Sequence, residues 1–340
     1  MDNIYEISKE KIENKINEIL DKEINKFSDN EFIRGSIEEL KRLSKGGKRV
    51  RGYLVKVGQM LFGKDDDSYI DLAAALEIFQ TAILIHDDII DEADKRRGMD
   101  TINFKYKGHL GISKAICIGD LGFFISYRII NKMDLTDELK AEIARIYSKT
   151  LYNTVNGEIV DVELPLKSLK YHKDMDEKII YDIYINKTAW YTIIGPILIG
   201  AASANASYED KKKLAEAGIN LGIAFQIKDD LLGLYSDVST IGKTLNDIKE
   251  NKQTIIYKYA IDHATDEQLE IINMYYGKED TNEENTKKLL DLFEKLGAKE
   301  NAEKLVKKYT DKGIDIINNM DANNKEIFIN FANYLLKRKN

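Results

Sequence analysis

Residues 72–91 read LAAALEIFQTAILIHDDIID, and this stretch decides the fold. For about five helical turns it is apolar nearly all round, with neither proline nor glycine to interrupt it. A helix that is apolar on every face is typical of the buried centre of a large helical protein. We therefore predict a core helix over residues 72–90, which runs directly into a cluster of carboxylates.

The rest of the chain repeats this helical pattern. Apolar residues recur at three- and four-residue steps in residues 4–20 and 32–43, as on the inner face of an amphipathic helix. Runs that are apolar on most faces predict buried helices over residues 53–61, 113–130, 179–200 and 214–234, followed by amphipathic helices over residues 262–340. Only two prolines, Pro165 and Pro196, interrupt the chain, and we find no linker or repeat. The sequence predicts an all-α protein in which residues 1–340 form a single domain, one large helical bundle.

Composition and charge restrict the classes of function that the protein can have. The 340 residues include 51 basic and 58 acidic side chains, and the net charge of -7 argues against nucleic acid as the main partner. Cys117 is the only cysteine, which excludes an intrachain disulfide and a cysteine zinc site, and we predict that it is buried and inert. The polar start does not resemble a signal peptide, and the least polar long stretch, Thr192–Ala206, is too short to cross a bilayer. We therefore expect a cytoplasmic protein with no transmembrane segment.

Two acidic clusters interrupt the apolar runs. Asp87 and Asp91, with Asp88 between them, would project from the end of one helix, where unbalanced carboxylates raise each other's pKa values. Magnesium would relieve that repulsion, because it binds one or two carboxylates and completes its shell with water and phosphate oxygens. Taken alone, the segment fits a solvated helix end equally well. A second apolar run that ends in Asp229-Asp230 favours two carboxylate clusters around a metal-bound polyphosphate.

Basic segments accompany both clusters. The loop GGKRVRG (46–52) combines flexible glycines with three cations, and Arg96-Arg97-Gly98 follows the first aspartates. Further cations in turns or at helix ends are Lys187, Lys243 and Lys252. Arginine binds phosphate through two parallel hydrogen bonds, and lysine acts as a mobile point charge. Each segment alone fits an ordinary solvated basic turn, but together with the aspartates and the apolar helices they indicate a ligand with an anionic, metal-bound head and an apolar tail.

These segments, in this order, resemble the trans-type isoprenyl diphosphate synthases, the polyprenyl synthetases that include farnesyl and geranylgeranyl diphosphate synthases. The motifs are GGKRVRG (46–52), HDDIIDEADKRRG (86–98), GD (119–120), GEIVD (157–161), KT (187–188), FQIKDD (225–230), GK (242–243) and DIKENK (247–252). The resemblance implies a bundle of the isoprenoid synthase type around a deep central cavity and, usually, a homodimer. It also implies three magnesium ions per active site and head-to-tail condensation of isopentenyl diphosphate with an allylic diphosphate.

The resemblance assigns roles residue by residue. Magnesium on the allylic diphosphate would be held by Asp87, Asp91 and Asp229, with Asp88 and Asp230 in support. The same diphosphate would be bound by Arg96, Lys187, Lys243 and Lys252, and isopentenyl diphosphate by Gly47, Lys48, Arg51, Gln80 and Arg97. Thr188 and Gln226 would line the reaction centre and stabilise the allylic cation. The basic C-terminal Lys337-Arg338-Lys339 is similar to a tail that closes over the isopentenyl diphosphate site in some members, although most basic tails are solvated.

Product length is expected to depend on the helix that leads into the first aspartates. In the family, the residue five positions before the first aspartate often forms the floor of the cavity, and short-chain synthases tend to place an aromatic side chain there. This chain has Ala82, with Ile83 beside it, and a methyl group cannot block a growing tail. Phe79 lies about 4.5 Å deeper along the helix and is the next candidate floor, although it also fits ordinary core. We therefore expect a product near geranylgeranyl diphosphate rather than farnesyl diphosphate.

Three places depart from the family pattern. One is Met99-Asp100, which follows Arg97-Gly98 where Lys-Pro or a similar pair is frequent. Gly233 stands where a further aspartate is common in the second motif, and Glu158 stands where glutamine is common. Two alternative functions remain open: a regulatory subunit that has lost catalysis and acts on a partner synthase, and a class I terpene cyclase. Cyclases usually lack the second aspartate motif and need no isopentenyl diphosphate site, so Asp229-Asp230 and Gly47-Lys48 favour the synthase.

Overall fold

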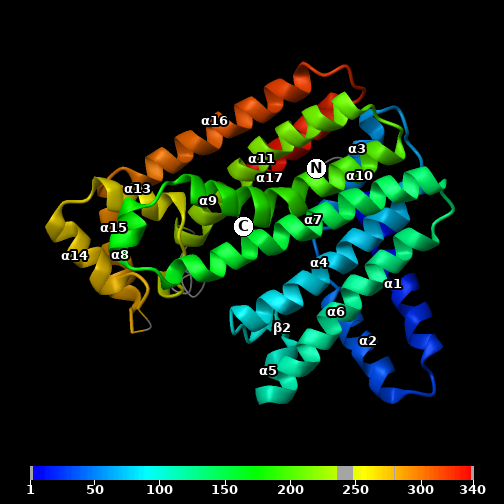
Figure 1. Ribbon diagram of the computed structural model, residues 1–340, viewed down its shortest axis with the longest axis horizontal. Helices are drawn as coiled ribbons and strands as arrows, with labels where there is room; N and C mark the ends of the chain where they lie inside the picture. The colour runs from blue at the N-terminus through cyan, green and yellow to red at the C-terminus, as the bar shows by residue number, and fades with distance from the viewer. Residues whose placement is uncertain (1–2, 236–247, 279, 338–340) are drawn as a thin grey trace. The chain divides into compact units, whose positions relative to one another are not determined.

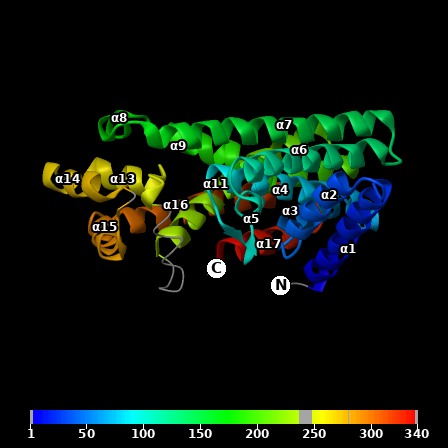
Figure 2. The same ribbon diagram turned by 90° about the horizontal axis from the view of Figure 1, so that it is seen from below.

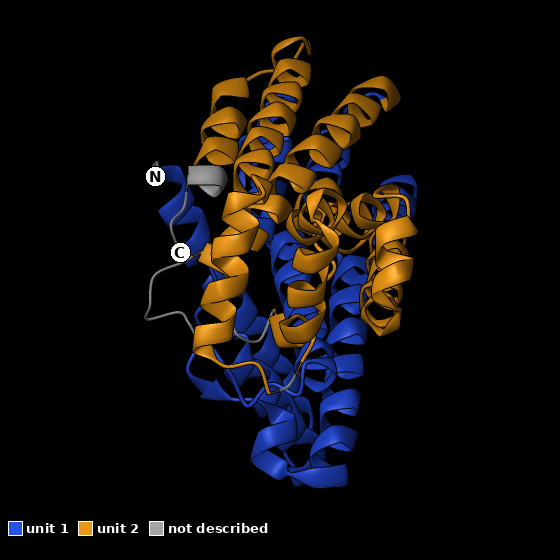
Figure 3. Ribbon diagram, turned by 90° about the vertical axis from the view of Figure 1, so that its left-hand side faces the viewer, with its two compact units in different colours: residues 1–147, 196–207 blue, residues 148–195, 208–340 orange. Residues whose placement is uncertain are grey.

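The computed structural model describes residues 3–235, 248–278 and 280–337, and helices account for most of these ranges. The chain divides into two compact units, which Figure 3 colours separately. Unit 1 comprises Met1–Tyr147 and Pro196–Ser207, and unit 2 comprises Ser148–Gly195 and Tyr208–Asn340. The predicted all-α class is confirmed, and the prediction that residues 1–340 act as a single domain stays a prediction.

Unit 1 is built around the helix over residues 72–90 that the sequence predicts. Its elements are α1 (Asn3–Lys26), α2 (Glu31–Leu43), α3 (Val50–Leu61), η1 (Asp67–Tyr69), α4 (Ile70–Ile90), β1 (Lys95–Arg96), β2 (Met99–Asp100), α5 (Ile102–Tyr106), α6 (Gly108–Lys132), the first part of α7 (Asp137–Glu163) and most of α10 (Gly195–Ser203). The two strands pair antiparallel, with Arg96 opposite Met99. Helix α4 lies alongside α6 (Figure 1), and its apolar side chains are buried on most faces.

Small residues let the helices of unit 1 approach closely. A Cβ atom at Gly58 of α3 would lie 2.4 Å from the carbonyl oxygen of Ile197 on α10, and one at Gly200 of α10 would lie 2.1 Å from the carbonyl oxygen of Val55. Two facing glycines therefore allow α3 and α10 to pack backbone against backbone. The same device brings α6 onto α4 at Gly122, where an added Cβ would lie 2.9 Å from the Cβ of Ala82.

Unit 2 holds the remaining helices around a second core. Its elements are the rest of α7, η2 (Leu164–Leu166), α8 (Leu169–Asp174), α9 (Lys178–Ile183), the π-helix η3 (Tyr184–Ile194), α11 (Tyr208–Tyr235), α13 (Ile255–His263), α14 (Asp266–Tyr275), α15 (Glu283–Lys295), α16 (Ala298–Asn318) and α17 (Lys325–Lys337). Helix α11 packs against α16 and η3. Helices α13, α14 and α15 gather towards one end of α16 (Figures 1 and 2), around a buried cluster that includes Tyr257, Leu289 and Phe293.

Three sequence-based predictions about the helices were wrong or incomplete. Helix α7 was not predicted, because exposed aliphatic residues such as Val155 (56% exposed) and Ile159 (51%) blur its amphipathic pattern. Helix α6 was predicted to be buried, yet Phe124 (68% exposed) and other apolar side chains lie on its outer face. Cys117 belongs to that face and is exposed rather than buried. Hydropathy alone does not distinguish a buried helix from one with an uncovered apolar face.

Within the residues that the structure describes, two helices are long and apolar enough to span a membrane by length and composition alone. They are Asp67–Ile90 and Gly108–Lys132. The apolar 18-residue window of the first is 72% buried, and that of the second is 39% buried. Neither helix is the stretch Thr192–Ala206, which is shorter than both. The burial of α4 is that of a core helix, whereas α6 leaves an apolar face uncovered.

Candidate active site

The loop GGKRVRG is fixed in unit 1 by a buried arginine. Gly46 (φ 80°) and Arg49 (φ 52°) adopt left-handed backbone conformations that turn the chain into α3 at Val50. Arg49 is 2% exposed, and its guanidinium lies 2.7 Å from a carboxylate oxygen of Glu13 and 3.5 Å from one of Glu77. The other oxygen of Glu77 accepts a hydrogen bond from the backbone N–H of Gly52 at 2.9 Å. Arg49 therefore anchors the loop through these contacts. The surrounding sequence alone does not indicate this role.

Positive charge gathers beside this loop. Arg97, on the turn between β1 and β2, donates to the carbonyl of Lys45 at 3.2 Å, and its guanidinium would lie 3.4 Å from a Cβ at Gly47. Burial and then the charge of Arg49 lower the pKa of Arg97 from its ordinary value. A guanidinium that its cationic neighbours destabilise is one that a bound anion would stabilise. Because Gly47 has no side chain, the guanidinium groups of Arg49 and Arg97 can approach the backbone of the loop.

The other residues predicted for isopentenyl diphosphate lie in the same unit. Gln80 is buried on α4, one turn after Glu77, and its Oε1 has no hydrogen-bond partner in the part of the chain that the structure describes. Lys48 is exposed and Arg51 is partly buried. A buried amide oxygen without a partner is costly in an ordinary core. This cost supports a ligand site that Gln80 completes.

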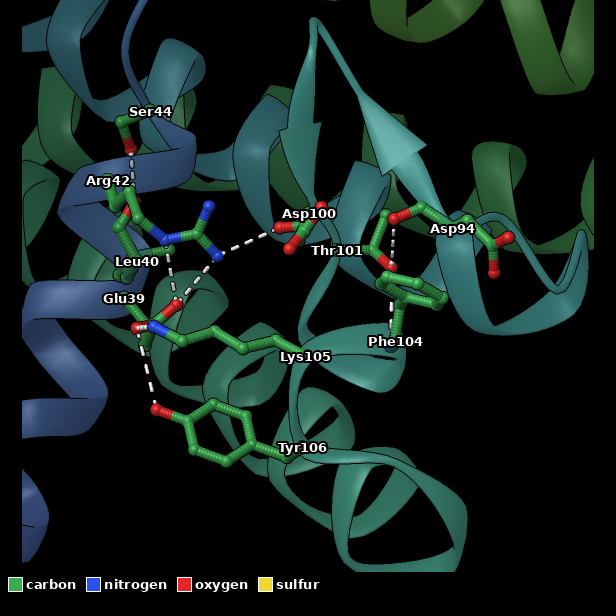
Figure 4. Close-up of polar contacts among 10 residues, drawn as sticks. All are labelled: Glu39, Leu40, Arg42, Ser44, Asp94, Asp100, Thr101, Phe104, Lys105 and Tyr106. Carbon is green, nitrogen blue, oxygen red and sulfur yellow. Dashed lines mark hydrogen bonds and ion pairs between the residues drawn. The ribbon is translucent and has the colours of Figure 1, made fainter.

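A network around Glu39 supports the hairpin that carries Arg96 and Arg97 (Figure 4). Glu39 is buried on α2 and accepts hydrogen bonds from Arg42 at 2.7 and 2.9 Å and from Lys105 at 2.5 Å. Arg42 in turn donates to the carbonyl of Asp100 at 3.0 Å. Burial would raise the pKa of Glu39, but its hydrogen bonds to Lys105 and Arg42 lower it overall. Sequence reasoning missed Glu39, because one acid on an amphipathic helix carries no signal of its own.

The first aspartate cluster separates into one buried and two accessible carboxylates. Asp88 is 1% exposed and accepts a hydrogen bond from Nε of Arg96 at 2.5 Å. Burial raises the pKa of Asp88, and Arg96 opposes that rise. Asp87 is partly buried and Asp91 exposed, one helical turn apart at the end of α4. Arg96 also lies 3.5 Å from Asp87, so this predicted diphosphate ligand is paired with the aspartates in the structure.

His86 accounts for the GD motif at residues 119–120. Its Nε2 lies 3.3 Å from the carbonyl oxygen of Ile116 and 3.5 Å from a carboxylate oxygen of Asp120. A Cβ atom at Gly119 would collide with the imidazole at 2.3 Å. The histidine therefore packs against α6 immediately before Asp87, in a place that requires glycine at position 119.

In unit 2, Lys187 lies on the π-helix η3 between two carboxylates. Its Nζ is 2.8 Å from Oε2 of Glu158 and 2.6 Å from Oδ2 of Asp161, both on α7. A Cβ atom at Gly157 would lie 2.2 Å from the backbone nitrogen of Lys187, so α7 and η3 touch through their backbones. π-Helical segments occur frequently at functional sites. Apolar periodicity predicted this segment as an ordinary helix, because it does not register the wider hydrogen-bond spacing.

A chain of hydrogen bonds joins Thr188 to the second aspartate pair. Thr188 donates to Oε1 of Gln226 at 2.6 Å, and Nε2 of Gln226 donates to Asp230 at 2.8 Å. Tyr184 donates to the other oxygen of Asp230 and accepts from the backbone N–H of Ile255 at 2.9 Å. Burial and then the charge of Asp230 raise the pKa of the Tyr184 phenol well above its ordinary value, so it stays a donor. The sequence analysis did not identify Tyr184.

The structure describes some, but not all, of the remaining predicted site residues. Asp229 is partly buried on α11, and Gly233, the departure in the second motif, is buried on the same helix. Lys252 pairs with Glu250 at 3.0 Å, and its carbonyl accepts a hydrogen bond from Tyr276 at 2.6 Å. Lys243 and the tail residues Arg338 and Lys339 lie outside the described residues, and the structure describes only the backbone of Lys337.

No three carboxylate, imidazole or thiol groups converge on one metal position within residues 3–235, 248–278 and 280–337. Asp88 is bound to Arg96, and Asp230 is bound to Gln226 and Tyr184, which leaves few carboxylate oxygens for a metal in either unit. Magnesium requires no more, because it commonly takes one or two carboxylates together with substrate phosphates. The oxygen donors in both units therefore fit a hard cation that arrives with its ligand.

Comparison with known proteins agrees with these features. The family model for polyprenyl synthetase matches residues 37–293. The chain is 29% identical over 299 residues to the geranylgeranyl diphosphate synthase of Sulfolobus acidocaldarius, across 86% of this chain and 87% of that one. It is 32% identical over 250 residues to the short chain isoprenyl diphosphate synthase of Methanocaldococcus jannaschii, across 73% and 72% of the two chains. The chain belongs to the polyprenyl synthetase family.

A solved geranylgeranyl pyrophosphate synthase has the same fold. The crystal structure of the geranylgeranyl pyrophosphate synthase from Corynebacterium glutamicum, complexed with isoprenyl diphosphate and magnesium, matches with a TM-score of 0.85 and 25% identity. The match covers 96% of this chain and 97% of that one. The present chain is therefore a prenyltransferase, an enzyme that elongates prenyl diphosphates.

The residues predicted to limit product length in this polyprenyl synthetase are packed against α6 and α7. Phe79 is 1% exposed, and its ring centroid lies 5.5 Å from that of Phe123 and 5.4 Å from that of Tyr147. Ala82 is fully buried against Gly122, and Ile83 is partly buried. A phenylalanine at position 82 would therefore be forced into α6. Phe79, which closes an aromatic cluster, is the better position for a test of product length.

Proposed function

We propose that this enzyme condenses isopentenyl diphosphate with an allylic diphosphate to give a trans-prenyl diphosphate. The observation that carries the proposal is the positive site around Gly47 and Arg97, in the unit that also holds the buried, incompletely bonded Gln80. A synthase needs such a site for its second diphosphate substrate, whereas a terpene cyclase does not. The same site also disfavours a regulatory subunit, which would have no use for it.

The proposed residues divide the reaction between them. Arg96, Lys187, Lys243 and Lys252 would bind the allylic diphosphate, whose carbon–oxygen bond breaks as the diphosphate leaves with the bonding electrons. The double bond of isopentenyl diphosphate, held by Gly47, Lys48, Arg51, Gln80 and Arg97, attacks the allylic carbon, and loss of a proton then restores a double bond. Thr188 and Gln226, joined at 2.6 Å, would stabilise the positive charge that develops in between.

Magnesium is the metal that the donor set fits. Asp87, Asp91 and Asp229 would hold it on the allylic diphosphate, with Asp88 and Asp230 orienting cations and hydrogen bonds around them. When bound, it would neutralise the charge of the departing diphosphate. Divalent metal in relatives supports this assignment, since solved structures contain magnesium or calcium with isoprenyl diphosphate. The proposed number is three ions per active site.

The proposed product is geranylgeranyl diphosphate or a neighbouring length. Ala82 has only a methyl group where short-chain enzymes tend to carry a ring, and Phe79 is the first aromatic side chain below it along the helix. Relatives named as geranylgeranyl and geranylfarnesyl diphosphate synthases support this range. The enzyme is proposed to act in the cytoplasm as a homodimer, and the uncovered apolar face of α6 supports self-association.

The experiment is an elongation assay. Purified protein with magnesium, labelled isopentenyl diphosphate and dimethylallyl, geranyl or farnesyl diphosphate should release pyrophosphate and yield labelled products that separate by chain length. Protein that is folded but releases no pyrophosphate with any of these primers would overturn the proposal in favour of the regulatory subunit. Cyclic hydrocarbons formed from the primer alone would favour the cyclase.

A further inference from the structure

The N-terminal helix α1 contacts the loop GGKRVRG, although α1 lies outside residues 37–293, which the family model matches. The hydroxyl of Tyr5 donates to the backbone carbonyl of Lys48. At the end of the loop, a Cβ atom at Gly52 would lie only 2.8 Å from Cδ1 of Ile12. Tyr5 and Ile12 are seven residues apart, so one face of α1 covers the loop at both places.

A third contact comes from the residue that follows Ile12. Glu13 accepts a hydrogen bond from Nε of Arg49 at 2.7 Å, and its side chain is 32% exposed. Of the two terminal nitrogens of the guanidinium, one donates to the carbonyl of Ser44, and the other lies 3.5 Å from a carboxylate oxygen of Glu77. Each nitrogen of the guanidinium thus has a partner. Ser44 and Glu77 are buried, so Glu13 is the partner that solvent reaches.

These contacts fix a costly backbone conformation. Arg49 has a φ angle of 52°, in the left-handed region that residues with a Cβ atom rarely adopt. Such a residue keeps this conformation only where its surroundings hold it. Lys48 immediately precedes Arg49, and Arg51 follows two residues later. The direction of both predicted ligands therefore depends on the backbone that Arg49 fixes.

We propose that Glu13 is a positioning residue for isopentenyl diphosphate: by holding Arg49, it fixes the loop that presents Lys48 and Arg51 to the diphosphate. This inference rests on the proposed function, because it takes the loop as the binding site. The charge of Glu13 would by itself act in the opposite direction, since a carboxylate near the site repels a diphosphate. Removal of Glu13 should therefore tighten binding if its charge dominates, and weaken binding if its hold on Arg49 does.

The test is steady-state kinetics of the full-length protein with magnesium, isopentenyl diphosphate and the allylic primer on which the elongation assay finds turnover. We expect Glu13→Ala to raise the KM for isopentenyl diphosphate about five- to tenfold, as the loss of one partly solvated, charge-assisted hydrogen bond implies. The kcat and the KM for the primer should stay within about twofold of the wild type. A variant that merely folds less well would lower kcat and leave both KM values unchanged.

Two further variants sharpen the comparison. Glu13→Gln keeps an oxygen that can accept from Arg49, so its KM for isopentenyl diphosphate should rise less than that of Glu13→Ala. The matched control is Glu10→Ala, which removes an exposed carboxylate three residues earlier on the same helix and should leave all three constants unchanged. Thermal melts establish that each variant is folded during the assay.

Hydrogen exchange in the ligand-free protein measures the loop directly. The backbone N–H of Gly52 donates to Glu77 at 2.9 Å, and that of Tyr53 donates to the carbonyl of Arg49 at 2.9 Å. Both amides should exchange faster in Glu13→Ala than in Glu10→Ala, because the loop opens more often once Arg49 has lost a partner.

An unchanged or lower KM for isopentenyl diphosphate in Glu13→Ala, or an equal rise for both substrates, would overturn the inference. Equal exchange of the two amides in Glu13→Ala and Glu10→Ala would overturn it as well. The elongation assay on the wild type keeps the two ideas apart. An active wild type whose kinetics Glu13→Ala does not alter defeats only this inference, whereas a wild type that is inactive with every primer defeats the proposed function.

Discussion

Asp87 and Asp91 are accessible carboxylates at the end of a buried helix, and their loss should affect turnover far more than stability. Asp87→Ala or Asp91→Ala should lower kcat by at least about a hundredfold, because a charge that positions metal at the leaving group is gone. Removing one of two neighbouring negative charges should leave the melting temperature unchanged or raise it slightly. Product assays and thermal melts on the same samples check both parts.

Asp88 is expected to affect stability, unlike Asp87 and Asp91. It is buried and bound to Arg96, so Asp88→Ala should destabilise unit 1 by about 2–4 kcal/mol as it strands a partly buried guanidinium. If Asp87→Ala keeps near wild-type turnover, or if Asp87→Ala and Asp88→Ala melt alike, the division of this cluster into metal ligands and a structural partner is wrong.

Phe79 is the side chain whose truncation should change the product. Phe79→Ala removes a ring from the cluster with Phe123 and Tyr147, and we expect products at least one isoprene unit longer. The cavity should also cost about 3–5 kcal/mol of stability. Phe293→Ala, which truncates an equally buried ring in unit 2, is the matched control and should destabilise without lengthening. Products of identical length from Phe79→Ala and wild type would show that another surface stops elongation.

His172 should make the protein sensitive to acid. It is 1% exposed, its Nε2 lies 3.0 Å from the carbonyl oxygen of Leu164, and burial lowers its pKa below the ordinary 6.5. The unfolded chain then binds the proton more readily, so the free energy of unfolding should fall as the pH drops below about 6.5. Denaturant titrations of the wild type and of His172→Gln, which cannot titrate, should diverge in that range. If the wild type and His172→Gln lose the same free energy of unfolding between pH 7 and pH 5, His172 is not the cause of the acid sensitivity.

At the scale of elements, the contact between α7 and η3 depends on one glycine. Gly157→Ala would place a Cβ 2.2 Å from the backbone nitrogen of Lys187, so the π-helix must shift, and Lys187 and Thr188 with it. We expect kcat to fall about ten- to a hundredfold, since displacements of this order at reacting groups are costly. Gly35→Ala in α2, where a Cβ would meet nothing within 4 Å, should keep full activity and gain up to about 1 kcal/mol of stability. A fully active Gly157→Ala would mean that η3 tolerates the shift.

The same elements show what the sequence could and could not predict. The course of α4 follows from its apolar residues, and family motifs select Lys187 and Asp230 as site residues. The π-helical hydrogen bonding of η3 could not be predicted, because a run that is apolar on most faces has no clear periodicity to separate one helix type from another. The anchoring role of Arg49 was equally hidden, since Lys48, Arg49 and Arg51 belong to one short basic segment of the sequence and differ in what they contact after folding. Tyr184 depends on a partner 46 residues away along the chain.

At the scale of the whole molecule, the outer face of α6 is an apolar surface that a single chain leaves uncovered. Ile112 (44% exposed), Ile116 (45%), Phe124 (68%) and Tyr127 (42%) lie along it. Clustered apolar side chains of this kind are typical of protein interfaces. A second copy of the chain would present the same face, and two such faces can bury each other around a two-fold axis.

Cys117, the only cysteine in the chain, reports on that face directly. It is exposed on α6 next to Ile116, so in the proposed homodimer its thiol should react slowly with a maleimide. Phe124→Glu should place a charge in the interface, convert the dimer to monomer in sedimentation experiments and raise the reaction rate of Cys117 to that of an open thiol. Tyr208→Glu, which changes an exposed aromatic residue (76% exposed) at the start of α11, is the matched control and should alter neither mass nor rate. A wild type that sediments as a monomer, or a Cys117 that reacts equally fast in the wild type and in Phe124→Glu, would show that α6 is not where two chains meet.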